Sequence, residues 1–206
     1  MTADVVAMPK QPLSLDAQRE AFASRRFLAM PLAGSIAWTI VAIGGATLPL
    51  ALAVWVLFLA TGMIVWLGVG LSRLTGEDFM DKTRPKNAFD ALFFSTVAMA
   101  LLAWAIAIPF FRADPTSLPL SVGILSGMMW LPLSWTIRHW IGWFHAIVRT
   151  ALVLVAHYAW PDHRFVAVPL AIVAIYLVTI VVLERRWRAR QGAGLANPSM
   201  EMAEKA

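Results

Sequence analysis

The sequence predicts an all-α integral membrane protein: one bundle of six transmembrane helices with both chain ends in the cytoplasm. Three observations lead to this fold class, namely the composition, six long apolar segments, and the placement of the basic residues. Hydrophobic residues make up 60% of the 206 residues and charged residues only 14%, whereas about a quarter of a soluble domain is charged. We therefore expect a lipid bilayer around the chain.

Six apolar segments are separated by short polar or proline-containing turns. Each has the roughly 20 residues that a helix needs to cross the hydrocarbon of a bilayer. They are residues 27–47, 50–71, 88–111, 118–137, 139–160 and 165–183. Because the turns are short, successive helices should be antiparallel neighbours. Together they form a transmembrane domain over residues 27–187.

The two ends of the chain lack such segments. Residues 1–26 are predicted to be a cytoplasmic N-terminal segment whose first 12 residues are disordered. Ser14 is a candidate helix cap with Asp16 in the first turn. This pattern fits a short helix on the membrane surface, and an ordinary polar lead-in fits equally well. Residues 188–206 are predicted to form a disordered basic and polar cytoplasmic tail.

The basic residues indicate the orientation. Of the 17 Lys and Arg residues, only Arg112 and Arg164 lie in connections on the side opposite the chain ends, and Arg149 lies within a span. An excess of Lys and Arg marks the cytoplasmic side of a membrane protein. Both termini are therefore expected to be cytoplasmic. The same distribution accounts for the net charge of +5 without a nucleic-acid partner.

Arg149 lies near the middle of the fifth span. A charge at the centre of a bilayer costs about 2.5 kcal/mol or more, so Arg149 should face protein or water. His145 precedes it by one helical turn, and Arg138 and His139 stand at the start of the span. One hypothesis is that these four residues bind a small anion, since a guanidinium suits oxyanions, or take part in proton transfer.

The alternative hypothesis makes Arg149 structural. Pro132 has no N–H, so the carbonyl of Met128 loses its helix partner and the fourth span should kink there. Met128 lies at nearly the depth of Arg149, which can therefore tie the kinked helix to the fifth. Gly123 and Gly127 in the same span allow close helix packing, more readily within the bundle than in a dimer.

Other chemistry finds little support. The absence of cysteine excludes disulfides, thiolate metal sites and cysteine nucleophiles. The spacing of the four histidines does not suit a metal site, and the sequence has no phosphate-binding glycine loop or nucleophile elbow. We therefore expect no metal and no cofactor. An enzyme is the less supported class.

Three functional classes remain open. The first is a small transporter or permeability protein with a midplane site at His145 and Arg149 for an anionic or proton-coupled solute. The second is a non-catalytic membrane subunit or scaffold in which Arg149 is structural. The third is a lipid-modifying enzyme that uses Arg138, His139 and His145. A homo-oligomer is compatible with all three, and the sequence does not specify one.

Three stretches of the sequence resemble a known family. They are Trp-Phe-His-Ala-Ile-Val-Arg-Thr at residues 143–150, Pro-Asp-His-Arg-Phe-Val-Ala-Val-Pro at residues 161–169, and Leu-Ser-Arg-Leu at residues 71–74. The chain, roughly from residue 14 to 187, is similar to an uncharacterised family of small bacterial multi-pass membrane proteins. This resemblance implies a multi-pass protein of the bacterial inner membrane, and it assigns no catalytic residue.

Overall fold

The computed structural model describes residues 13–81, 83 and 85–196. Within them every regular element is a helix, which confirms the all-α prediction. Five helices are long and apolar enough to cross a membrane, or six when one bent pair is counted as a span. The predicted disorder of residues 1–12 and of the end of the tail, residues 197–206, lies outside the described residues.

The helices follow the predicted order, with one short helix before the first span and three spans divided in two. The elements are α1 (Leu15–Ala23), α2 (Ala29–Thr47), α3 (Leu50–Gly62), α4 (Ile64–Thr75), α5 (Ala88–Leu102), α6 (Trp104–Ala113), η1 (Pro115–Ser117), α7 (Leu118–Gly127), α8 (Trp130–Ile137), α9 (Ile141–Ala159), η2 (Pro161–His163) and α10 (Arg164–Ala196).

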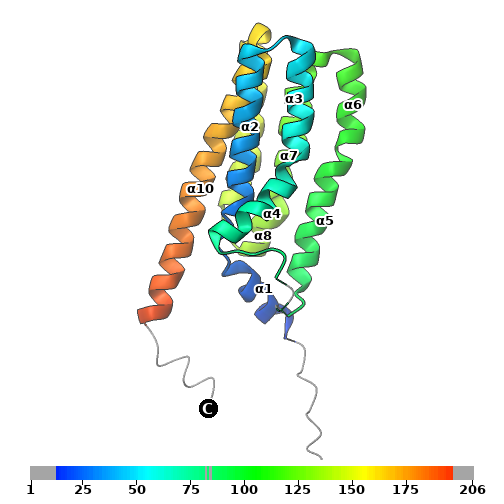
Figure 1. Ribbon diagram of the computed structural model, residues 1–206. Coiled ribbons are helices and arrows are strands. Elements are labelled where there is room, and N and C mark those ends of the chain that lie inside the picture. The colour runs from blue at the N-terminus through cyan, green and yellow to red at the C-terminus, as the bar shows by residue number, and fades with distance from the viewer. Residues whose placement is uncertain (1–12, 82, 84, 197–206) are drawn as a thin grey trace, which may run out of the picture.

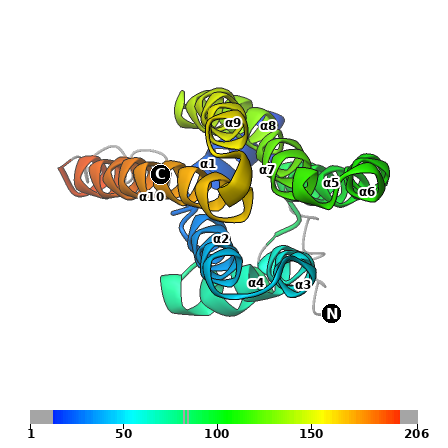
Figure 2. The same cartoon turned by 90° about the horizontal axis from the view of Figure 1, so that it is seen from above.

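The helices α2, α9 and α10 form the centre of the bundle, whereas α5 and α6 lie at its edge (Figures 1 and 2). A close crossing holds α2 against α10: a Cβ added at Gly45 would lie 2.3 Å from the carbonyl oxygen of Phe165. In the α5–α6 span only 17% of the residues are buried, against 50% in α2. The edge span is therefore the one held most loosely.

One of the six spans bends sharply, and two more contain a short irregular turn. The fourth is divided between Gly127 and Trp130, just before Pro132, where the sequence predicts a kink. The second bends by 47° between α3 and α4 at Met63. The third has one turn residue, Ala103, but its N–H bonds to the carbonyl of Met99 and its carbonyl accepts from the N–H of Ala107, each at 3.1 Å, so the helix runs through it. The sequence analysis expected both of these spans to be continuous, which is wrong for the second span and holds for the third. At the second span the reason is Gly62, a weak helix former directly before the bend.

The short helix α1 lies across the end of the bundle at which α10 also ends (Figure 1). Ser14 caps it by accepting a hydrogen bond from the N–H of Ala17 at 3.2 Å. Phe22 is 2% exposed and packs against the rings of Phe27, Phe89 and Phe93. These contacts attach α1 to the bundle itself.

The last helix differs from the predicted tail. The sequence analysis placed disorder from residue 188 onward, whereas α10 is helical to Ala196. Two ion pairs lie along the extension: Arg188 contacts Glu184 one turn earlier at 2.8 Å, and Arg190 contacts Glu20 of α1 at 2.7 Å. The helix is thus supported beyond its apolar part.

Candidate functional site

The four residues predicted to bind a solute occupy two separate places. Arg149 and His145 are buried inside the bundle, with exposures of 1% and 0%. Arg138 and His139 lie in the link between α8 and α9, where Arg138 has a left-handed backbone (φ 48°) and is exposed. The structure therefore brings the first two together and leaves the other two at the end of the bundle.

Arg149 is the centre of a buried hydrogen-bonded network that joins three helices. Its Nη2 donates to the hydroxyl of Ser126 on α7 at 2.9 Å, and its Nη1 to the hydroxyl of Tyr176 on α10 at 3.3 Å. Nη1 also lies 3.3 Å from Nε2 of His145, whose Nδ1 lies 2.8 Å from the hydroxyl of Thr179. We call these five residues the Arg149 cluster.

The hydrogen bonds of the cluster specify the state of His145. The Thr179 hydroxyl donates its hydrogen to the carbonyl of Ile175 at 2.8 Å, so it accepts the hydrogen bond from Nδ1–H of His145. Nε2 then accepts from the Arg149 guanidinium. A proton on Nε2 would point at that cation, so this arrangement holds His145 as a neutral imidazole, which disfavours proton transfer through it.

The charge of Arg149 has no carboxylate partner among the described residues. Two aromatic rings face the guanidinium in place of a carboxylate. Its central carbon lies 5.6 Å from the ring centre of Trp38 and 5.4 Å from that of Tyr176. Its Nε–H has no acceptor. A Cβ added at Gly127 would lie 3.3 Å from Nε, so the α7 backbone packs close to this atom.

The carbonyl of Met128 does not accept a hydrogen bond from Arg149. It accepts one from the N–H of Leu131 at 3.1 Å, and Arg149 reaches α7 through the side chain of Ser126 instead. The two glycines of α7 both face the interior: Gly127 contacts Arg149, and a Cβ at Gly123 would lie 3.1 Å from Ile172. Arg149 therefore ties the fifth span to the fourth and to the sixth.

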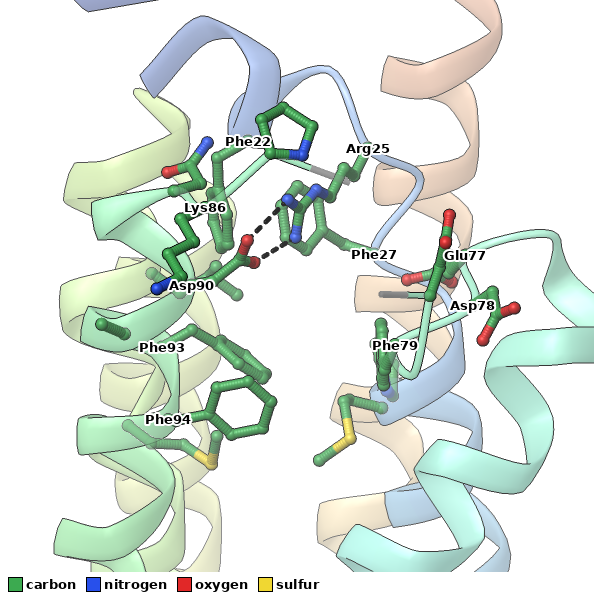
Figure 3. A pocket seen from close by; sticks show the side chains of 18 of the residues that line it. Phe22, Arg25, Phe27, Glu77, Asp78, Phe79, Lys86, Asp90, Phe93 and Phe94 are labelled. Carbon is green, nitrogen blue, oxygen red and sulfur yellow. Dashed lines mark hydrogen bonds and ion pairs between the residues drawn. The ribbon is translucent and has the colours of Figure 1, made fainter. Parts of the chain in front are cut away.

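A cavity of about 390 Å³ opens between α2 and α5, near α1 (Figure 3). Sequence reasoning missed it, because its walls come from four separate parts of the chain. We call it the α2–α5 cavity. Aromatic side chains supply much of its lining, namely Phe22, Phe27, Phe79, Phe93, Phe94 and Trp130. A drug-sized molecule needs a pocket of about 300–1,000 Å³, so the cavity is large enough for a small organic molecule.

An ion pair spans the α2–α5 cavity. Arg25, in the α1–α2 link, reaches across to Asp90 of α5 and binds both carboxylate oxygens, one of them at 2.9 Å (Figure 3). The guanidinium carbon also lies 4.9 Å from the ring centre of Phe22. Lys86 is the other basic residue of the described lining, which has four carboxylates, those of Glu77, Asp78, Asp81 and Asp90.

Glu77 holds one wall of the cavity in place. Leu28, which directly precedes α2, provides no side-chain cap for the helix. One carboxylate oxygen of Glu77 instead accepts hydrogen bonds from the N–H groups of Leu28 and Ala29, each at 2.8 Å. A carboxylate there satisfies free N–H groups and suits the positive end of the helix dipole. The loop after α4 is thereby fastened to the start of α2.

Trp130 separates the cavity from the Arg149 cluster. It stands at the break between α7 and α8, lines the α2–α5 cavity, and is 5% exposed. Its ring stacks on the ring of His145, with 4.1 Å between the centroids. One aromatic side chain is thus the wall between an open aromatic cavity and a closed polar network.

The pair at the α8–α9 link has a different character. Burial, with Arg186 and Arg190 adding to it, lowers the pKa of His139 below its usual value. The Nδ1 of His139 accepts a hydrogen bond from the N–H of Ile141 at 3.3 Å. His139 therefore caps the start of α9, and Arg138 beside it lines shallow hollows at the surface.

The comparisons with known proteins agree with the expected family. The chain belongs to a family of unknown function, DUF7010, which it matches over residues 15–186. The predicted resemblance to an uncharacterised family is thereby confirmed. No curated protein and no solved structure matches the chain.

Proposed function

We propose that this protein is a small membrane transport or permeability protein whose solute binds in the α2–α5 cavity. The observation that carries the proposal is the position of the cavity: it extends from one end of the bundle inward to Trp130, and Trp130 packs on the Arg149 cluster. A solute at Trp130 has therefore entered the bundle, and one side chain separates it from the Arg149 cluster.

The irregular turn in the fourth span supports the same proposal. Transporters commonly build their binding sites from discontinuous transmembrane helices, whose free ends line the site. Here Met129 and Trp130, at the break between α7 and α8, line the cavity. The loosely held α5 forms the opposite wall with Asp90 and Phe94. A span with few buried contacts moves relative to the bundle more readily than the central helices.

In this proposal the membrane is the bacterial inner membrane and both termini are cytoplasmic. The end of the bundle that carries α1, the loop after α4 and the end of α10 holds most of the basic residues. The α2–α5 cavity therefore opens toward the cytoplasmic side. Arg149 and His145 remain a proposed anion site or proton site only if a pathway extends beyond Trp130.

A second candidate is a non-catalytic membrane subunit. The observation in its favour is that Arg149 is 1% exposed and bonded to side chains of α7 and α10, as a structural tie between helices would be. The third class, a lipid-modifying enzyme, finds less support: at the α8–α9 link Arg138 lines only shallow hollows, and His139 is used as a helix cap.

Accessibility of the cavity from both membrane sides tests the proposal. The chain contains no cysteine, so a single Ala91→Cys change places one thiol in the cavity lining. The matched control is Ala151→Cys, on the exposed face of α9 away from the cavity. We expect a membrane-impermeant thiol reagent to modify Cys at position 91 from the side of the termini and more slowly from the opposite side, but not to modify position 151.

Modification from one side only would contradict transport and favour the membrane-subunit alternative. Modification at neither position from either side would contradict the cavity as a solute site.

A further inference from the structure

We propose that the α2–α5 cavity binds an amphiphilic organic cation, whose positive group takes the place of the Arg25 guanidinium at Asp90. This inference rests on the proposed function and specifies its solute. The starting observation is that the protein already holds a cation there: Arg25 binds both oxygens of Asp90 and lies over the ring of Phe22.

The chemistry around that position suits a positive charge on an apolar body. Aromatic faces attract cations through their quadrupole, and more strongly where water is excluded. The rings of Phe93 and Phe94 line the same wall as Asp90, and Phe79 lies across the cavity from them (Figure 3). An apolar body extending inward from Asp90 would meet these rings and then Trp130.

The aromatic lining favours a cation over an anion. Arg25 already lies over the ring of Phe22, and the rings of Phe93 and Phe94 line the cavity beside Asp90. The negative face of an aromatic ring attracts a cation and repels an anion, so an anionic solute would gain nothing from these rings. Deeper in the bundle the charge of Arg149 repels a cation, so the positive group is expected to stay near Asp90, outside Trp130.

Exchange of Arg25 for a solute is physically easy. The side chains of Arg25 and Asp90 are 22% and 35% exposed, and ion pairs this open to solvent contribute little to stability. Arg25 belongs to the link between α1 and α2, so it can leave Asp90 without unfolding a helix. A bound cation would restore the charge balance at Asp90 while its body fills the cavity.

Binding of tetraphenylphosphonium to the protein in lipid nanodiscs tests this inference, with empty nanodiscs as the background. Tetraphenylborate is the matched probe, because it has the same shape and the opposite charge. We expect saturable binding of the phosphonium that Asp90→Asn weakens by about tenfold, equivalent to about 1.4 kcal/mol. Arg25→Gln should strengthen the binding, because it removes the competing guanidinium.

Asp114→Asn is the control for Asp90→Asn. Asp114 also pairs with an arginine, Arg164 at 3.3 Å, but it lies in the connection between α6 and α7 and does not line the cavity. Its substitution should leave the binding of the phosphonium unchanged. If Asp90→Asn does not fold, the comparison of wild type with Arg25→Gln and of the two probes still decides the question.

The contrary outcomes show whether this inference alone fails or the proposed function fails with it. Tighter binding of the borate, or weaker phosphonium binding in Arg25→Gln, would overturn the cation as ligand but keep the cavity as a solute site. Saturable binding of neither probe would overturn both. Adding phosphatidylethanolamine to phosphatidylglycerol nanodiscs distinguishes the source of the cation. Competition would identify a lipid ammonium group as the occupant, and unchanged affinity would support a free solute.

Discussion

The two sides of Trp130 differ in how their charges are satisfied. On one side Arg149 is fully buried, and neutral hydroxyls, an imidazole and two aromatic faces surround it. On the other side Arg25 and Asp90 form a partly exposed ion pair across an open cavity. The buried cation has lasting partners on four helices, α2, α7, α9 and α10, whereas the open pair has partners that a solute can replace.

This difference indicates which charge holds the fold together and which is available for binding. A buried charge that loses its partners leaves unpaired polar groups in a dry interior, which is expensive. A half-exposed charge that loses its partner is rehydrated at little cost. In our proposal Arg149 therefore belongs to the structure and the surroundings of Asp90 to the solute, although Arg149 is the more conspicuous residue in the sequence.

The largest expected effect on stability comes from adding one methyl group on each side of Trp130. A Cβ at Gly34 would lie 2.4 Å from the Tyr176 ring, and one at Gly68 would lie 2.3 Å from the sulfur of Met30. Tyr176 is confined by Arg149, so Gly34→Ala should lower the free energy of unfolding by about 2 kcal/mol. Met30 lines the cavity and can move into it, so Gly68→Ala should cost less than about 1 kcal/mol.

Thermal unfolding of the two variants measures this contrast, with Gly70→Ala as the control because nothing lies within 4 Å of its added Cβ. Equal losses at Gly34 and Gly68 would show that the two sides of the bundle are packed equally tightly.

A smaller effect on stability is expected from substitution of Thr179, the member of the Arg149 cluster that contacts only His145. Thr179→Val leaves Nδ1–H of His145 without an acceptor, which should cost about 1 kcal/mol of unfolding free energy. Thr150→Val is the control, because its hydroxyl bonds only to the carbonyl of Ala146 in its own helix, at 2.8 Å. Denaturation in detergent compares the two, and a greater loss for Thr150→Val would argue against the network.

The smallest effect is a pH dependence at the opposite end of the bundle. Hydrogen bonds from the hydroxyl and N–H of Thr116, with the charge of Arg164, lower the pKa of Asp114. A carboxyl whose pKa is lowered by folding stabilises the fold above its unfolded pKa of about 3.9, and this is lost as the pH falls through the lowered value. The stability difference between wild type and Asp114→Asn should therefore be constant near pH 7 and shrink below about pH 4.

Thermal unfolding between pH 3 and pH 7 checks this prediction. A difference that grew as the pH fell would mean that the folded protein favours the protonated carboxyl.

Much of the fold follows from local features of the sequence. The apolar lengths predict where the spans lie, Ser14 predicts the start of α1, and Pro132 predicts the break before it. The bend at Met63 has a weak local signal in Gly62, but glycine is common in transmembrane helices and does not by itself indicate a bend. The extension of α10 depends on Glu20, a residue 170 positions away from its partner Arg190.

The candidate site is harder to predict, because it too depends on contacts between residues that are distant in the sequence. Arg149 and His145 share a face of one helix, so their contact follows from helical spacing. The partners on α7 and α10 depend on how the helices pack, and Tyr176 has no motif that marks it. The α2–α5 cavity depends on Glu77 capping α2 across 48 residues or more. Such contacts between distant segments have no signature in a single sequence.

One measurement tests the assignment of the two charges most directly: thermal unfolding of wild type and Arg149→Gln, each with chloride, phosphate, sulfate, a carboxylate panel or tetraphenylphosphonium. We predict that Arg149→Gln unfolds at a lower temperature under every condition, that no anion changes this difference, and that the phosphonium stabilises both proteins alike. A ligand at 100 times its dissociation constant adds about 2.7 kcal/mol, which such a measurement detects easily. An anion that stabilises wild type but not Arg149→Gln would contradict the account and make Arg149 the ligand site.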